Sequence, residues 1–269
     1  MKTRTKYLIV FLLGVIVGGA AEYGFLVHVW PHRYQSYSWV YALRNHRKPG
    51  EPCETDLVLD RQGYSLGYSY KHKSALWVSY VISSGSIGID VDRGRSFYAD
   101  PDIPERYRVE PEDHTRTGYD RGHLAPSAAI DFSLQANRET YALSNIIVQE
   151  GELNREAWHQ LENYVREWTR TKGKLYVVTG PLYSSRPKKV NGLAIPSRFY
   201  KVIYSYDGDE AIGFIFPNKP VSHEEVWKYA MSVAEVERKT DLTFFSRFRE
   251  KTQRELKESV DIGWWQKDL

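Results

Sequence analysis

Cysteine is nearly absent from this chain of 269 residues, in which Cys53 is the only one. A single thiol excludes an intrachain disulfide framework and a cysteine-rich zinc site. The sequence also lacks a His-Glu-x-x-His zinc motif, a phosphate-cradling GxxxxGK-Ser/Thr loop and a GxGxxG dinucleotide fingerprint. The chain therefore offers no support for a zinc peptidase, a P-loop nucleotide hydrolase or a dinucleotide-binding oxidoreductase.

Excess charge is small as well. The formal net charge is +3, of which Lys2, Arg4, Lys6 and Glu22 together contribute +2. The rest of the chain is nearly neutral, so a claim of nucleic-acid binding must rest on local clusters of basic residues. With 42% hydrophobic and 26% charged residues, the composition is that of a folded domain with a substantial core.

Residues 1–30 carry a membrane-targeting pattern. A basic cluster over residues 2–6 precedes an uncharged run over residues 7–21, and an apolar patch over residues 23–27 follows Glu22. The uncharged run fits a cleavable signal peptide, whereas the added patch extends it towards the roughly 20 residues of a membrane-spanning helix. We favour a single retained anchor that keeps the basic end cytoplasmic and the rest of the chain extracytoplasmic, or in the intermembrane space of an organelle. Cleavage would instead give a secreted protein.

The remaining chain divides into three predicted parts. Residues 31–52 lack periodicity and end in a stretch with two prolines and a glycine, which is typical of a tether. Residues 53–250 hold the predicted domain, and residues 251–269 form a C-terminal tail. In that tail, Trp264 and Trp265 either cap the core or dock a partner.

Hydrophobic periodicity predicts the elements of the domain. Tyr64–Tyr70 and Leu76–Ser83 flank a polar turn and predict a β-hairpin, and helical spacing predicts helices over Asn154–Thr169 and His223–Val236. Further strands are predicted over Thr140–Gln149, Leu175–Thr179, Phe199–Ser205 and Ala211–Phe216. We expect an α+β fold with a mainly antiparallel central sheet flanked by helices.

The stretch Asp120-Arg121-Gly122-His123 combines a carboxylate, a cation and a potential base. In an extended strand, Arg121 and His123 project to one side and Asp120 to the other. Gly122 lacks a Cβ and is expected to let a phosphodiester approach the main chain. A neutral imidazole, with an ordinary pKa of about 6.5, suits the removal of a proton from water near neutral pH. For these four residues alone, a surface turn with an ordinary ion pair is the better interpretation, because short motifs match by chance.

A second group of motifs lies downstream. Leu143-Ser144-Asn145-Ile146-Ile147-Val148-Gln149 is followed by a run in which Leu153-Asn154 precedes Trp158 and Leu161-Glu162. In this order and spacing, the two groups resemble the DNA/RNA non-specific endonuclease family, the ββα-metal nucleases that include the endonuclease G type. The resemblance extends from about Tyr64 to Phe245, through Trp77-Val78, Arg95-Ser96-Phe97, Thr179-Gly180-Pro181, Ile195-Pro196, Phe216-Pro217-Asn218 and Phe244-Phe245.

This resemblance implies a central six-stranded sheet with helices on both faces and a ββα-metal active site. It also implies that His123 is the general base and that Asn154 is the metal ligand. An amide oxygen suits a hard cation, Mg²⁺ or alternatively Mn²⁺, which retains several waters and takes another oxygen from the substrate phosphate.

Five further residues are assigned supporting or charge-stabilising roles. On a regular α-helix Glu162 lies roughly 12 Å beyond Asn154 and about 80° around the axis, so we expect it to hold metal-bound water. Arg121 and Arg95 match the arginines of the family's active site and are expected to clamp the phosphate. Asn145 is expected to support the backbone or to orient the base, and Asp120 is assigned a supporting role beside it.

The sequence thus predicts a Mg²⁺-dependent endonuclease that hydrolyses DNA and RNA with little sequence or sugar selectivity. One rival is a non-catalytic nucleic-acid-binding protein on the same scaffold, which would not need the complete polar set. A second rival is a phosphodiesterase for small substrates. His114 and His159 are expected to be ordinary surface or helix-face histidines, and Arg155, which departs from the family's usual pattern, is expected to alter substrate access.

Overall fold

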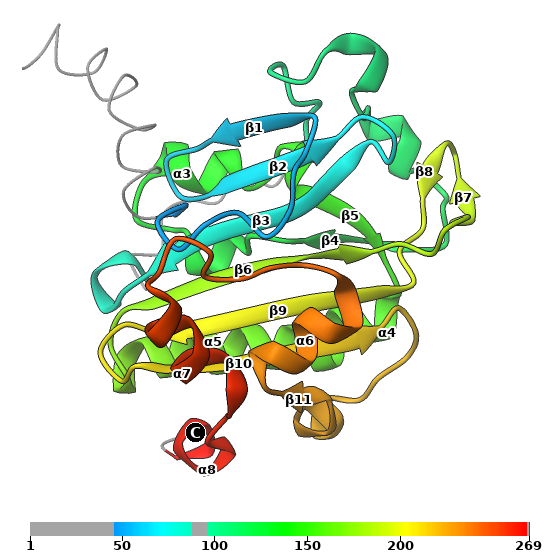
Figure 1. The fold of residues 1–269 in the computed structure, drawn as a ribbon. Helices are drawn as coiled ribbons and strands as arrows, with labels where there is room; N and C mark the ends of the chain where they lie inside the picture. Colours follow the sequence, from blue (N-terminus) through cyan, green and yellow to red (C-terminus); the bar gives the residue numbers. More distant parts are fainter. Residues whose placement is uncertain (1–45, 88–95, 268) are drawn as a thin grey trace, which may run out of the picture. The chain divides into compact units, whose positions relative to one another are not determined.

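A seven-stranded sheet forms the centre of the fold in the computed structural model, which describes residues 46–87, 96–267 and 269 (Figure 1). Its strand order is β1-β2-β3-β6-β9-β10-β11, and each neighbouring pair is antiparallel. The strands are β1 (Leu57–Asp60), β2 (Ser65–Ser69), β3 (Ser74–Ile82), β6 (Leu175–Leu182), β9 (Arg198–Ser205), β10 (Glu210–Pro217) and β11 (Ala230–Met231).

Two small antiparallel pairs and several helices complete the described residues. The pairs are β4 (Asp120–His123) with β5 (Ile146–Gln149), and β7 (Lys189–Val190) with β8 (Leu193–Ala194). The helices are α3 (Leu134–Glu139), α4 (Gly151–Leu153), α5 (His159–Thr171), α6 (Val233–Thr240), α7 (Glu250–Glu258) and α8 (Ile262–Gln266), with a π-helical turn over Asn154–Trp158.

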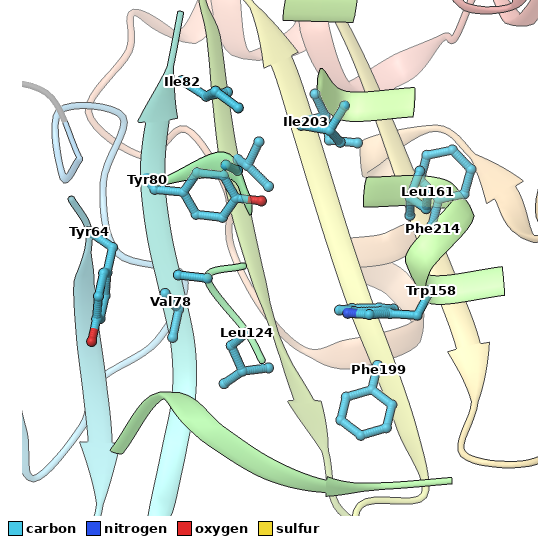
Figure 2. Close-up of a cluster of buried hydrophobic side chains, with 14 of the residues drawn as sticks. Tyr64, Val78, Tyr80, Ile82, Leu124, Trp158, Leu161, Phe199, Ile203 and Phe214 are labelled. Carbon is cyan, nitrogen blue, oxygen red and sulfur yellow. The ribbon is translucent and has the colours of Figure 1, made fainter. Parts of the chain in front are cut away.

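The sheet is buried on both faces. On β9, Phe199 and Ile203 belong to one core and Tyr200 and Val202 to the other, as the alternation of side chains along a strand requires. Helix α5 covers the first face, where Figure 2 shows Trp158 and Leu161 pointing towards the strands. Helices α6 and α7 contact the sheet on the opposite side (Figure 1) through Val233, Val236 and Leu256. The central sheet is thus covered by helices on both of its faces.

The predicted fold class is confirmed, with one correction to the sheet. The hairpin predicted around residues 71–74 is present as β2 and β3, and strands β6, β9 and β10 cover the ranges predicted for them. The sheet has seven strands instead of the six implied by the resemblance. The seventh is the two-residue strand β11, which pairs with Gly213 and Phe214 of β10.

Two predicted elements are wrong in extent. The strand predicted over Thr140–Gln149 begins only at Ile146, because the preceding residues form a bridge and a 3₁₀ turn that internal hydrogen bonds close. The helix predicted over His223–Val236 is two helices: a 3₁₀ segment (His223–Tyr229) and α6. Ser232 caps α6, since its side chain accepts a hydrogen bond from the backbone N–H of Glu235, and strand β11 separates the two.

Both ends of the described chain pack on the domain. His46, near the end of the predicted tether, is buried, and its Nδ1 accepts a hydrogen bond 3.0 Å long from the N–H of Val81. In the predicted tail, Trp265 is buried against Trp168, whose Nε1 donates to the Trp265 carbonyl at 2.6 Å. Trp265 thus caps the core. The predicted anchor, residues 1–30, lies outside the described residues, and no helix within those is both long and apolar enough to cross a membrane.

Candidate active site

The active-site candidates lie on a β-hairpin followed by a helix. Strand β4 pairs with β5 so that Asp120 lies opposite Gln149 and His123 opposite Ile146. The chain leaves β5 directly into α4, the π-helical turn and α5. The start of this helical segment is fixed from outside, since Asn218 Oδ1 accepts from the N–H of Glu150 at 2.7 Å. The arrangement is a ββα unit.

Gly122 is required for packing within this hairpin. A Cβ at Gly122 would lie 2.1 Å from Oε1 of Gln149, a side chain that is itself buried. The space beside Gly122 is therefore already occupied. Our expectation that Gly122 opens the main chain to a phosphodiester is wrong for this reason.

Asn145 ties the residues after β4 to the turn before β5. Its Oδ1 accepts from the N–H of Ala125 at 2.9 Å, and its Nδ2 donates to the carbonyls of Ala125 and Thr140 at 2.9 and 2.8 Å. Its own carbonyl accepts from the N–H of Leu124 at 3.0 Å. Three of these hydrogen bonds fix the chain immediately after His123, and the fourth ties Asn145 to Thr140.

His123 sits between two aromatic rings. Its ring centroid lies 5.6 Å from that of Phe97 and 5.2 Å from that of Tyr141, the latter edge to face. Burial lowers the pKa of His123 from its usual range to about 4, because the charged form loses hydration. Its Nε2 finds no hydrogen-bond partner among the described residues. The imidazole is therefore neutral around pH 7, as a general base must be.

Arg121 lies on the same side of β4 as His123. Its guanidinium carbon is 5.4 Å from the centroid of the Phe97 ring that also contacts His123, and its Nη2 donates to the carbonyl of Pro111 at 3.3 Å. Arg95 lies outside the described residues.

Asp120 orients the amide of Asn154. Asn154 Nδ2 donates to Asp120 Oδ2 at 3.0 Å, and Nη1 of the exposed Arg155 lies 3.3 Å from Asp120 Oδ1. Because a carboxylate only accepts hydrogen bonds, Asp120 selects the NH₂ end of the amide. The carbonyl Oδ1 of Asn154 is then the atom left for a cation.

The π-helical turn brings Asn154 and Glu162 to one cavity of about 380 Å³. One extra residue in the turn makes an eight-residue separation behave like seven, which on an α-helix returns to within roughly 20° of the starting direction. The expected offset of about 80° is therefore wrong, since it assumed a regular helix. The N–H of Ala157, part of this turn, donates to the carbonyl of Val221 at 3.4 Å, outside the helix.

The cavity also contains residues that sequence reasoning missed. It is lined by His123, Pro126, Ser127, Ala128, Asn154, Arg155, His159, Glu162 and Arg166. His159 and Arg166 lie seven residues apart on α5, which places both on one helical face, and Arg155 lies in the π-helical turn before them. That spacing was readable from the sequence once Asn154 was chosen as a starting point. His159 is exposed on the helix, as expected, and it also lines the cavity. His114, which was expected at the surface, is instead buried.

Glu162 is held by positive charge. Its side chain is 11% exposed, and its Oε1 lies 3.6 Å from Nζ of Lys201. Burial raises the pKa of Glu162, while Lys201 and then Arg166 oppose that rise. Glu162 Oε1 and Arg166 Nη1 find no hydrogen-bond partner among the described residues.

This donor set fits a hard divalent cation with few protein ligands. Within residues 46–87, 96–267 and 269, no three His, Cys, Asp or Glu side chains gather to form a metal cage. The cavity instead offers an oriented amide oxygen at Asn154 and the carboxylate of Glu162, which lies in an ion pair with Lys201. Such a set suits an ion that keeps much of its water.

Comparisons with known proteins place the chain in a family. The sequence pattern of the DNA/RNA non-specific endonucleases matches residues 44–251. Nuclease C1 of Cunninghamella echinulata var. echinulata is 33% identical over 74% of this chain and 86% of its own length. The mitochondrial nuclease EXOG of Mus musculus is 29% identical over 92% of this chain and 74% of its own length.

A solved structure agrees. A chain in the crystal structure of the EndoG/EndoGI complex, which concerns the mechanism of EndoG inhibition, matches with a TM-score of 0.69 and 31% identity. The match covers 77% of this chain and 92% of that one. The protein belongs to the DNA/RNA non-specific endonuclease family. It is a nuclease, a hydrolase that acts on nucleic acids, which confirms the predicted family and enzyme class.

Proposed function

We propose that this protein is a Mg²⁺-dependent endonuclease that hydrolyses phosphodiester bonds in both DNA and RNA. The observation that carries the proposal is the convergence of His123, Asn154 and Glu162 on one cavity. A phosphodiester needs a base for the attacking water and positive charge for its developing negative charge. Mn²⁺ is the alternative cation.

Asn154 would hold the cation through Oδ1, and Glu162 would accept hydrogen bonds from the surrounding water shell. When bound there, Mg²⁺ supplies Lewis-acid stabilisation of the negative charge on the phosphate. Asp120 keeps the Asn154 amide turned the right way, since it accepts from Nδ2 at 3.0 Å.

His123 would take the proton from the attacking water. Its neutral imidazole, enclosed by Phe97 and Tyr141, is kept in the basic form down to acidic pH by burial, which lowers its pKa to about 4. A lower pKa also makes it a weaker base, so proton transfer must be aided by positive charge near the water. Arg121, beside the same Phe97 ring, would add a fixed cation at the phosphate, and Arg95 is proposed for the same task.

The side chains and the cation proposed above contact the phosphate of the substrate and make no contact with its bases. Phosphate oxygens are common to DNA and RNA and carry no sequence information. Because external water is the nucleophile, the ribose 2′-hydroxyl is not needed. Products with 5′-phosphate ends are proposed from the family resemblance.

Matched DNA and RNA oligonucleotides of mixed sequence, cut at fixed salt and followed by mapping of the product ends, test this proposal. We expect both polymers to be cut at many positions, with 5′-phosphate on the products. Cleavage restricted to one polymer, or to one short sequence, would contradict the lack of selectivity.

We also propose that residues 1–30 anchor the protein in a membrane and leave the nuclease domain outside the cytoplasm or in an intermembrane space. The basic cluster and the uncharged run of residues 7–21 support this arrangement. Alkaline extraction of membranes, followed by the intact mass of the protein, tests it. A soluble product that begins just after the small residues Gly19-Ala20-Ala21 would show a cleaved signal peptide instead.

A further inference from the structure

A lysine lies buried beneath the active-site cavity. Lys201 is on the interior strand β9 of the large sheet, between β6 and β10, and its side chain is 0% exposed. Phe199 and Ile203, each two positions from Lys201, lie on the same face of the strand. Figure 2 shows these two side chains in the core that α5 covers. An ammonium group in such surroundings loses its hydration at a considerable cost in free energy unless charge or hydrogen bonds replace it.

The helical segment that carries the cavity residues supplies the charge and ring contacts that replace the lost hydration of the ammonium group. Lys201 Nζ lies 3.6 Å from Glu162 Oε1 and 4.1 Å from the ring centroid of Trp158. Burial lowers the pKa of Lys201 to about 8, and Glu162 acts against that change. No hydrogen-bond partner for Nζ is present among the described residues. The lysine therefore acts on Glu162 through charge at close range.

Glu162 depends on this charge in turn. Desolvation alone would favour its protonated form, and Lys201 is the largest opposing influence, ahead of Arg166. A protonated Glu162 would present a donor to the cavity, where the proposed water shell needs an acceptor. A buried ion pair is weak evidence for a stabilising role, because replacing both partners by apolar groups of similar volume is often neutral or stabilising.

We propose that Lys201 is a positioning residue that holds the Glu162 carboxylate as an oriented anion at the wall of the cavity. Lys201 acts through Glu162 and does not touch the substrate, so its role depends on the function proposed for Glu162.

A double-mutant cycle tests the proposal on the full chain. Lys201→Met replaces the ammonium by an apolar group of similar length, and it is made in the wild-type and Glu162→Gln backgrounds. Rates on an oligonucleotide give kcat and KM, and each variant is checked by circular dichroism and thermal melting. We expect Lys201→Met to lower kcat roughly 10- to 100-fold, as loss of an outer-shell partner does, with little change in KM. In the Glu162→Gln background we expect it to change kcat less than about twofold, because the two residues act as a unit.

Ile203→Met provides the matched control, since it alters an apolar side chain on the same face of β9 and should leave kcat nearly unchanged. If Lys201→Met does not fold, Lys201→Gln takes its place with a neutral polar side chain. Equal losses of kcat in both backgrounds, or no loss in the wild-type background while Glu162→Gln is slow, would overturn the role of Lys201. Wild-type activity in Glu162→Gln would instead overturn the proposed function of Glu162, and the role of Lys201 with it.

Discussion

The residues around His123 determine its position and its protonation state. Phe97 and Tyr141 enclose the imidazole, and Asn145 fixes the chain just beyond it. We expect His123→Ala to fold normally and to lose roughly 10² to 10⁴ in rate, the usual contribution of a general base. Initial rates of DNA cleavage measure the loss.

His159→Ala is the matched control for this prediction, because His159 lines the same cavity but is exposed. It should cost far less activity than His123→Ala. A folded His123→Ala variant with near-wild-type turnover would remove His123 from the mechanism.

Asn154 and Glu162 are expected to respond differently to metal. Asn154→Ala removes the proposed ligand, so the Mg²⁺ concentration that gives half-maximal activity should rise. Glu162→Ala should slow the reaction while leaving much of the metal binding intact, since it acts through water. Titration of activity with Mg²⁺ separates the two effects. Identical Mg²⁺ requirements in wild type and Asn154→Ala would count against the ligand assignment.

At the scale of elements, the site depends on how the helical segment begins. Asn218 Oδ1 accepts from Glu150 N–H at 2.7 Å and its Nδ2 donates to the Pro196 carbonyl at 3.0 Å. Asn218→Ala should therefore destabilise the protein by about 1–3 kcal/mol and lower kcat, because the start of the segment that carries Asn154 loses its anchor. Urea unfolding and steady-state rates measure both. Lys219→Ala, at the exposed neighbouring position, is the control; equal effects from the two would refute the anchor.

Much of this arrangement could be predicted from the sequence, and the exceptions have identifiable causes. Alternation along a strand correctly put Arg121 and His123 on one side of β4, because that depends only on local geometry. The π-helical turn could not be predicted, since it is stabilised by a carbonyl 64 residues away, Val221, to which Ala157 donates. The ion pair of Lys201 with Glu162 could not be predicted either, because it forms only when β9 packs against α5.

At the scale of the whole molecule, burial of histidines predicts a pH dependence of stability. Burial lowers the pKa values of His46, His114 and His123 to about 4, below their ordinary 6.5. Protonation therefore favours the unfolded chain. The contribution of these histidines to the free energy of unfolding is fully present above about pH 6.5. It is lost as the pH falls towards 4, by up to a few kcal/mol for each group.

Thermal unfolding between pH 7.5 and 5 checks this expectation, and the melting temperature should fall across that range. His46 is far along the chain from the site, so His46→Gln should make the decline shallower without removing activity. A melting temperature that rises on acidification would contradict the assignment of these histidines as neutral buried groups.

Cleavage of a covalently closed plasmid by the full chain is the most direct test of the central claim. A closed circle has no ends, so only an endonuclease can attack it. With Mg²⁺ we expect nicked, then linear, then short products, and no cleavage when a chelator removes the metal or when His123 is replaced by Ala. Persistence of the closed circle with Mg²⁺ present, or equal cleavage with the chelator, would contradict a Mg²⁺-dependent endonuclease.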